Sequence, residues 1–347
     1  MDQDPGQGTG IFPDPVVSAN LYCAGKLDPI ISGPVRDAWG RYREDAEGAD
    51  SYLWLMRYAR RGEHLKVRFH GSESEGARFR ALLDTHANDA LGTFDGSPAP
   101  ASQGVPGPPI DVEDGESEPH PDRSLLWTTY QRSFVSFGGK PLLDDEEYLA
   151  RFTRCLGAGT ELILSALAST DDGAFSHPLR RTTLWRALGA GLRALDLERP
   201  DGWASYLAYH RDWLIRFKVR GIDDAQGKSR QLLGRFQGRA QAGVIRGIAA
   251  MLETPDDPAL TAWGERIRRL AAYVQTFEDR PEYQLEPFAP QLSFSPVFKV
   301  FHGLANQLGL TMLDEGLTHH LMLRAVSPDF EPSPDGVALV PNLPKSE

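Results

Sequence analysis

A short basic segment is the best-marked candidate for chemistry in this sequence. It runs from His64 to His70 and reads HLKVRFH. Side chains alternate across a β-strand, so His64, Lys66, Arg68 and His70 are predicted to share one face, with neighbours about 6.6 Å apart. Charged or chargeable groups in a row repel one another, and acidic neighbours or an anionic ligand relieve the repulsion. The face is therefore predicted to hold an anionic group. The alternative is a solvated sheet face without a chemical role.

The elements around this segment are predicted from residue type and spacing. A strand is expected from Tyr52 to Tyr58, and the Gly-containing turn 59–63 joins it to the basic strand as an antiparallel β-hairpin. The basic segment is thus expected to lie inside an antiparallel sheet near the N-terminus. The other elements expected in this third of the chain are a strand at 16–23, a break in regular structure at Pro29 and Gly33-Pro34, a helix at 78–91 and a strand-like stretch at 127–130.

The second half of the chain carries the 3.6-residue apolar period of amphipathic helices. The last of these helices opens with a capping box, Thr311 with Asp314. The predicted fold class is α+β, with a β-rich N-terminal third packed against a mostly helical C-terminal half. Helices are expected over residues 148–167, 184–195, 203–217, 260–277, 297–308 and 311–326.

Composition divides the chain into one structured part and three flexible ones. Residues 1–13 and 331–347 are predicted to be a disordered lead-in and tail, and 14–330 a single α+β domain. Within it, residues 94–123 are rich in Pro, Gly, Ser and acidic residues and poor in apolar ones. Such a segment cannot bury enough surface to offset its ordering entropy, so it is predicted to be a flexible insertion.

Charge and hydropathy favour a cytoplasmic globular protein. The chain has 347 residues and shows neither a secretory signal nor an apolar run long enough to cross a membrane. Its two cysteines, Cys23 and Cys155, cannot form a disulfide framework and are expected to be buried thiols. The net charge of −11 repels phosphates, so no direct, stable nucleic-acid binding is expected.

Three segments resemble one known family. The run from Trp54 to Phe69, WLMRYARRGEHLKVRF, is similar to the signature W-x-x-x-R-Y-x-x-x-x-x-H-L-R-L-R-F of the lantibiotic dehydratase C-terminal (thiopeptide-type bacteriocin biosynthesis) family. Phe301 to Leu310 resembles its H-x-x-x-N-R-L-G segment, and Tyr130 to Gly139 resembles an element that starts with Tyr and ends with Gly-Gly. The matches occur in order and span most of the chain.

The resemblance implies one of two chemistries. One kind of member eliminates glutamate from glutamylated Ser or Thr of a ribosomally made precursor peptide, leaving dehydroalanine or dehydrobutyrine. The other kind joins two dehydroalanines in a formal [4+2] cycloaddition that makes a pyridine and releases the leader peptide. The first hypothesis is the glutamate-eliminating lyase of thiopeptide or lantibiotic biosynthesis, and the second is the stand-alone pyridine synthase. A third is a non-catalytic subunit that binds the leader peptide.

The resemblance also assigns roles to residues. Lys66 and Arg68 match the two arginines of the strand motif and would hold the glutamyl carboxylate. His302 matches the late histidine and would be the acid or base, with Arg132 as a further catalytic cation. The sequence departs from the family at Lys66, where a fork of donors is lost, and at Gln307, where an arginine is usual. The stretch from Gln131 to Ser136 also lacks the acidic and the second basic residue expected in full-length dehydratases. The remaining substrate-binding candidates are Arg57, His64, Ser133 and Asn306.

Other candidates are weaker. His210 lies on the apolar stripe of its helix and is expected to be a core histidine. The pair His319-His320 lacks the spacing of a helical zinc site, so no metal is assigned. No organic cofactor is expected, and the implied partners are the precursor peptide and a tRNA-dependent glutamylating protein. Basic stretches at 211–220 and 228–246 are read as solvated helix faces, or as guides for an acidic leader peptide or a tRNA-bearing partner.

Overall fold

The computed structural model describes residues 14–45, 50–58, 62–93, 121–128, 144–170, 175–219, 222, 224–254, 256–277 and 294–329. Its sheet has four antiparallel strands in the order β2-β3-β1-β4. The predicted hairpin is confirmed, because β2 and β3 pair from Tyr58 opposite His64 to Tyr52 opposite His70. The strands are β1 (Val17–Tyr22), β2 (Tyr52–Tyr58), β3 (His64–His70) and β4 (Ser124–Trp127).

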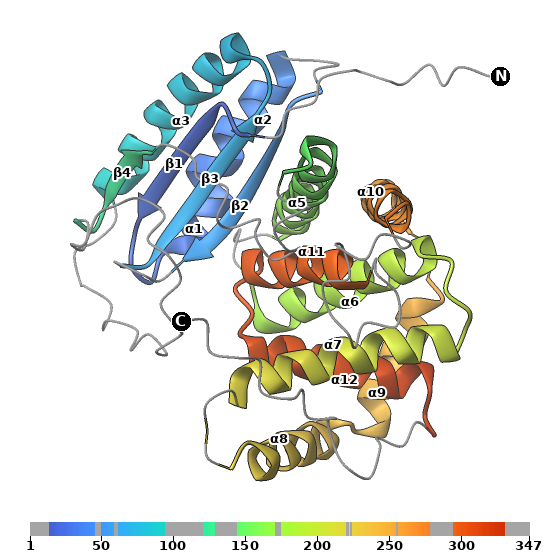
Figure 1. The fold of residues 1–347 in the computed structure, drawn as a ribbon. Helices are drawn as coiled ribbons and strands as arrows, with labels where there is room; N and C mark the ends of the chain where they lie inside the picture. Colours follow the sequence, from blue (N-terminus) through green and yellow to red (C-terminus); the bar gives the residue numbers. More distant parts are fainter. Residues whose placement is uncertain are drawn as a thin grey trace, which may run out of the picture.

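One face of the sheet is covered by helices of the same third of the chain (Figure 1). The β3 residue Phe69 packs against Trp39 and Tyr42 from one helix and against Phe79 from another. The α+β class is confirmed, but this third is less β-rich than predicted. The helices concerned are α1 (Leu27–Ile30), the π-helical turn η1 (Ile31–Val35), α2 (Arg36–Asp45) and α3 (Glu73–Thr93).

The break in regular structure predicted at Pro29 and Gly33-Pro34 is wrong, because these residues lie in helix. Pro29 falls in the first turn of α1, where its missing N–H would have no partner in any case. Pro34 falls within η1, a wider turn inside the run of helix. Ile30, Ile31 and Val35 are fully buried. Burial of this apolar face therefore outweighs the breaker signal of the two prolines.

The C-terminal half is helical, as predicted. Asp145, Ser176, Asp257 and Thr311 begin four of its helices with side chains that accept a hydrogen bond from the backbone, and Thr311 also donates to the Asp314 carboxylate at 2.7 Å. The predicted capping box is thus confirmed. The helices are α5 (Glu146–Ala168), α6 (His177–Ala194), α7 (Asp201–Val219), α8 (Ala225–Arg239), α9 (Ala242–Leu252), α10 (Pro258–Gln275), α11 (Phe294–Gln307) and α12 (Met312–Val326).

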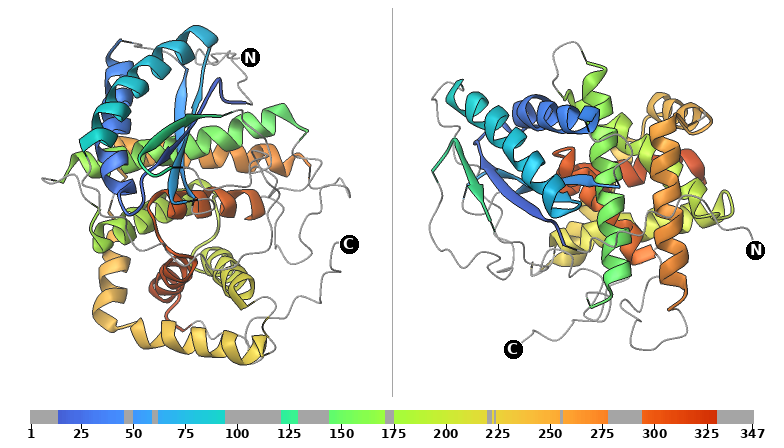
Figure 2. Two further views of the ribbon diagram at one scale, coloured as in Figure 1. Left: turned by 90° about the vertical axis from the view of Figure 1, so that its left-hand side faces the viewer. Right: turned by 90° about the horizontal axis from the view of Figure 1, so that it is seen from above.

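One hydrophobic core runs from the sheet into the helices. Helix α5 lies along the outer strand β2, where Gly157 leaves room for the ring of Tyr52. The helices α8 and α9 lie at the end of the molecule farthest from the sheet (Figures 1 and 2). Among the described helices, none has the length and apolar character needed to cross a membrane.

Candidate functional site

The basic face of β3 is buried. His64, Lys66 and Arg68 are each 3% exposed and His70 is not exposed at all. The alternative interpretation of this segment as a solvated sheet face is therefore wrong. It failed because strand alternation reports which side chains share a face, not what covers that face.

Neutral groups surround these basic side chains within the sheet. Arg68 Nη1 donates to the carbonyl oxygen of Ala19 at 2.8 Å and to Asn20 Oδ1 at 3.3 Å. The Lys66 ammonium lies 4.3 Å from the centre of the Tyr58 ring, which supplies a cation–π contact. The residues directly opposite this face on the neighbouring strands are all neutral: Ser18, Asn20 and Tyr22 on β1, and Tyr52, Trp54, Met56 and Tyr58 on β2.

Two histidines end this face and have contacts of their own. His64 Nδ1 lies 2.9 Å from the carbonyl oxygen of Gly62, and its ring centre is 4.5 Å from that of Tyr22. Trp54 Nε1 donates to His70 Nε2 at 2.9 Å, so His70 is the acceptor in that bond. Both rings thus help to fix the hairpin, and the predicted role of His64 in binding substrate stays a prediction.

Arg57 and Asn306 join the sheet to the helical half. The Asn306 carboxamide accepts from the backbone N–H of Arg57 at 2.9 Å and donates to its carbonyl oxygen at 3.0 Å. The Arg57 guanidinium donates to the Gln307 carbonyl oxygen and to Asp28, which also binds Arg180. These contacts give both residues a structural role, and their predicted contact with substrate stays a prediction.

The departure from the family pattern at Gln307 has a physical explanation. Gln307 is 1% exposed and lies between α11 and α5. Its side chain accepts from Thr160 Oγ1 at 3.1 Å and donates to the Leu156 carbonyl oxygen at 3.3 Å. An amide supplies both a donor and an acceptor without carrying a charge into the core, which an arginine would do.

His302 forms the best candidate for proton transfer. Its Nδ1 lies 2.7 Å from Glu315 Oε2, across the interface of α11 and α12. The Glu315 side chain is 2% exposed, whereas that of His302 is 31% exposed and so can be reached from outside. Glu315 lies in the first turn of α12, where the helix dipole favours a negative charge. A buried carboxylate thus orients a partly exposed imidazole.

Other ionisable groups lie around this pair. The His319 Nδ1 is 2.9 Å from the Glu315 carbonyl oxygen, and the His319 ring centre is 6.1 Å from that of His210. Phe298 stacks on His210 at 4.2 Å and lies 6.0 Å from His302. Nowhere in the described ranges do three or more His, Cys, Asp or Glu side chains gather as metal ligands would.

The three clustered histidines differ in their affinity for a proton. Burial lowers the pKa of His302, and so does the charge of Lys299, but the charge of Glu315 and its hydrogen bond outweigh both and raise the pKa above its ordinary value. Burial first, and neighbouring positive charge second, hold the pKa of His210 well below its ordinary value. Burial also lowers the pKa of His319. His302 is therefore the histidine of this cluster suited to exchanging protons.

The site is only partly the one that the sequence predicts. Arg132 and Ser133 lie outside the described residues. Lys66 and Arg68 have the contacts above within the sheet, whereas His302 contacts Glu315 and Phe298 in the helical half. Sequence reasoning missed Glu315, although its position one residue after the capping-box Asp314 places it in the first turn of α12.

Known structures share this arrangement of elements, although no family model and no curated protein matches the sequence. The pyridine synthase TbtD from thiomuracin biosynthesis matches with a TM-score of 0.61 and 19% identity, over 93% of this chain and 99% of that one. TsrL matches with a TM-score of 0.53 and 14% identity, over 90% and 94%. The tRNA-dependent lantibiotic dehydratase MibB from Microbispora sp. 107891 aligns over 94% of this chain and 29% of that one, with 17% identity and a TM-score of 0.49.

The chain thus belongs to a structural class in which a small antiparallel sheet is joined to a larger helical half. Within that class, its fold is that of the pyridine synthase TbtD and of TsrL. The resemblance inferred from the three sequence segments is confirmed at the level of the fold.

Proposed function

We propose that this protein is an enzyme of ribosomal peptide modification that carries out the pyridine-forming [4+2] cycloaddition, with His302 as its proton-transfer group. The observation that carries the proposal is the partly exposed His302 imidazole held by the buried Glu315 carboxylate. The match to nearly the full length of the pyridine synthase TbtD supports the choice of reaction.

The chemistry of cycloaddition suits such a pair. The amide on the N-terminal side of one dehydroalanine must become its iminol tautomer so that this residue can serve as a 2-azadiene. A proton therefore leaves the amide nitrogen and another reaches the oxygen. Aromatisation then requires loss of water and of the leader peptide as an amide, and each leaving group takes up a proton. An imidazole that accepts and returns protons at Nε2, while Glu315 holds Nδ1–H, can serve these steps.

Burial of the basic strand is the reason for preferring cycloaddition to glutamate elimination. Elimination requires cations that a glutamyl carboxylate can reach, and Lys66 and Arg68 are each 3% exposed. Cycloaddition needs no glutamate-binding cations, so it also tolerates the departures from the family pattern at Gln307 and Ser136. Elimination, the reaction that the resemblance of the basic strand to the family signature first favoured, remains the second candidate.

A two-substrate assay tests the proposal. The purified protein is given, separately, a leader-bearing peptide with two dehydroalanines and a leader-bearing peptide with one glutamylated serine. We expect the first to yield released leader amide and a pyridine chromophore, and the second to remain unchanged. Release of glutamate from the second peptide, lost in Arg68→Ala, would instead establish elimination.

Variants then test the role of His302. The change His302→Gln keeps a donor for Glu315 but cannot relay a proton, so the rate should fall by about 10²- to 10⁴-fold in a protein that remains folded at the assay temperature. The matched control is His86→Gln, at a half-buried histidine of α3 on the far side of the sheet, which should keep full activity. An active His302→Gln enzyme would remove His302 from the mechanism.

A further inference from the structure

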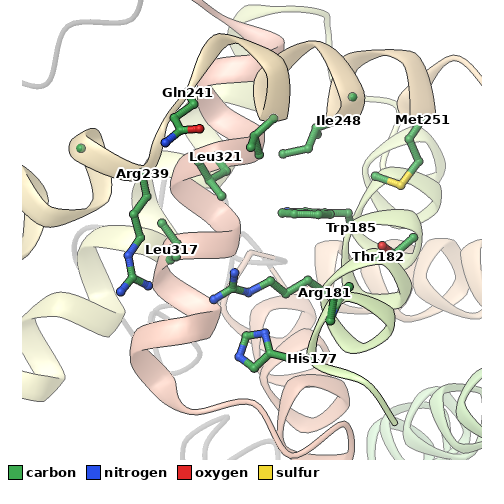
Figure 3. Close-up of a pocket in the computed structure, with 14 residues that line it drawn as sticks. His177, Arg181, Thr182, Trp185, Arg239, Gln241, Ile248, Met251, Leu317 and Leu321 are labelled. Carbon is green, nitrogen blue, oxygen red and sulfur yellow. The ribbon is translucent and has the colours of Figure 1, made fainter.

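The first turn of α12 is contacted from two directions. On one side, α12 faces a groove of about 830 Å³ that opens between α6, α9 and α12, and Leu317 helps to line it. Figure 3 shows the Arg181 guanidinium and the His177 ring extending from α6 toward α12 at the edge of this groove. On the other side, Glu315 contacts His302 of α11, because two residues correspond to roughly 200° around a helix.

Asp314 receives the contacts from α6. Its Oδ1 accepts a hydrogen bond from Arg181 Nη2 at 2.9 Å and lies 3.5 Å from His177 Nε2. Its Oδ2 accepts from Thr311 Oγ1 at 2.7 Å, so one oxygen binds the start of its own helix and the other binds α6. The side chains of Arg181 and Asp314 are 23% and 21% exposed, so salt screens this ion pair less than a pair on the open surface.

Asp314 carries its charge at neutral pH. Burial raises the pKa of Asp314, but hydrogen bonds from Thr311 and Arg181 and the charges of Arg181 and His177 outweigh burial and lower the pKa below its ordinary value. The guanidinium of Arg181 is also charged throughout this range. The ion pair between α6 and α12 is therefore present across the pH range in which histidines exchange protons.

The position of the Glu315 carboxylate depends on this turn. Its Oε2 lies 2.7 Å from His302 Nδ1, and its Oε1 has no hydrogen-bond partner within the described ranges. The backbone N–H of Glu315 donates to the Thr311 carbonyl oxygen at 2.9 Å, and the Glu315 carbonyl oxygen lies 2.9 Å from His319 Nδ1. The backbone of the first turn thus decides where the carboxylate lies relative to His302.

We propose that Asp314 is a positioning residue for the pair of His302 and Glu315. Held by Arg181 and His177 of α6, it fixes the first turn of α12 and with it the Glu315 carboxylate. The inference rests on the proposed function for the part that this pair takes in the reaction. Misplacement of a catalytic group by about 1 Å can cost about 100-fold in rate, so a contact outside the site can limit the reaction.

Substitution of Asp314 tests the proposal in the reaction. Asp314→Asn keeps the size of the side chain and an oxygen for Thr311, but it removes the charge that binds α6. We expect kcat to fall by about tenfold to a hundredfold with KM little changed, because Asp314 acts through Glu315 and not on the substrate. The matched control is Asp257→Asn, at the N-cap of α10, where Arg186 of the same helix α6 binds the carboxylate at 3.0 Å. The control should keep its kcat, and equal losses in the two proteins would overturn the proposal.

The pKa of His302, followed by NMR without substrate, gives a reading that a purely structural role would not move. The signal of His302 is the one missing from His302→Gln. A loosened pair lowers this pKa in both Asp314→Asn and Arg181→Gln, whereas the change of charge alone would lower it in the first and raise it in the second. Lys299 and Glu315, whose charges act directly on His302, are unchanged in both variants. Arg181→Lys keeps the positive charge and should keep the wild-type pKa, and opposite shifts or none would contradict the proposal.

Failure of this inference and failure of the proposed function give different results. Should Asp314→Asn not fold, Arg181→Gln alone decides, because only a loosened pair lowers the pKa of His302 when a positive charge is removed. A wild type that forms no pyridine, with a lowered pKa of His302 in both variants, would refute the function and leave the positioning role standing. A wild type that forms pyridine, with kcat and the pKa of His302 unchanged in both variants, would refute the positioning role and leave the function standing.

Discussion

His302 owes its suitability for proton transfer to a residue on another helix. An isolated imidazole at this depth would lose its proton easily, because burial and the charge of Lys299 both lower its pKa. Glu315 reverses that outcome through its charge and its hydrogen bond. The same contact fixes which nitrogen faces outward, since a carboxylate accepts Nδ1–H and leaves Nε2 for the substrate.

The pH dependence of activity should report this pairing. If neutral His302 acts as the base, kcat/KM should rise with pH through a pKa above the ordinary value of about 6.5. In Glu315→Gln, burial and the charge of Lys299 remain, and both lower the pKa of His302. The rise in kcat/KM should therefore move to a pH below about 6.5. Rates measured across pH for both proteins check this. An unchanged profile would contradict control of His302 by Glu315.

The contribution of His302 to the unfolding free energy should fall as pH rises. The folded-state pKa of His302 is raised, so the stabilisation that it contributes is fully present below the unfolded pKa and is lost as pH rises through the folded pKa. The difference in unfolding free energy between the wild type and Glu315→Gln should therefore be larger at about pH 6 than at about pH 9. Urea unfolding at the two pH values measures it.

At the scale of single residues, the sequence identified one member of the pair and not the other. His302 falls in a segment that resembles a family motif, whereas Glu315 belongs to no such segment. Its contact depends on the turn between α11 and α12, where Gly309 has a φ of +71°. The burial of Lys66 and Arg68 could not be predicted from the sequence either, because it depends on how separate segments pack around β3.

At the scale of elements, Asp28 holds the junction between the sheet and the helices. It binds Arg57 of β2 and Arg180 of α6, and these two guanidiniums also donate to the carbonyl oxygens of Gln307 and Leu308 at the end of α11. The arginine side chains are 15% and 13% exposed. Asp28, more than 270 residues earlier in the chain, thus holds the two arginines that donate to the carbonyl oxygens at the end of α11.

Removal of this carboxylate should destabilise the protein. In Asp28→Ala two largely buried positive charges lose their common partner, and we expect a loss of roughly 2–4 kcal/mol in unfolding free energy. The matched control is Asp37→Ala, whose partner Arg36 is 39% exposed, where the loss should be roughly 0–1 kcal/mol. Chemical denaturation compares the two. Equal effects would show that the junction is held by apolar packing alone.

The elements themselves were predictable where local signals agreed with burial. The hairpin, the capping box of α12 and the apolar periods of the helical half were all found in the sequence, because alternation and 3.6-residue spacing reflect one buried face. The helices over residues 27–45 were missed, because Pro29 and Pro34 are local signals against helix whereas the burial of Ile30, Ile31 and Val35 is a tertiary effect.

At the scale of the whole molecule, the insertion predicted at 94–123 has an anchored end. Residues 94–120 lie outside the described residues, but Asp122 accepts a hydrogen bond from the backbone N–H of Ala24 at 2.8 Å. Arg123 has a φ of 60° just before β4 begins. The boundary of the dispensable segment should therefore fall before Asp122.

Two deletions test this boundary. Removal of residues 97–119 should leave the melting temperature nearly unchanged, because their composition offers no apolar period that could pack on the core. Removal of residues 97–123 should lower it, because the contact with Ala24 and the approach to β4 are lost. Calorimetry of both proteins gives the answer. A loss of more than a few degrees in the shorter deletion would show that the segment packs.

The pairing of Asn306 with Arg57 has a consequence for how copies of the protein coexist at high concentration. Strand β2 is the last in the sheet, and an outer strand offers backbone groups on which another molecule can add a strand. The Asn306 carboxamide binds both backbone groups of Arg57, as a residue of a further strand would. One side chain thus closes the sheet at this point, and it protects the protein against the edge-to-edge association from which aggregates grow.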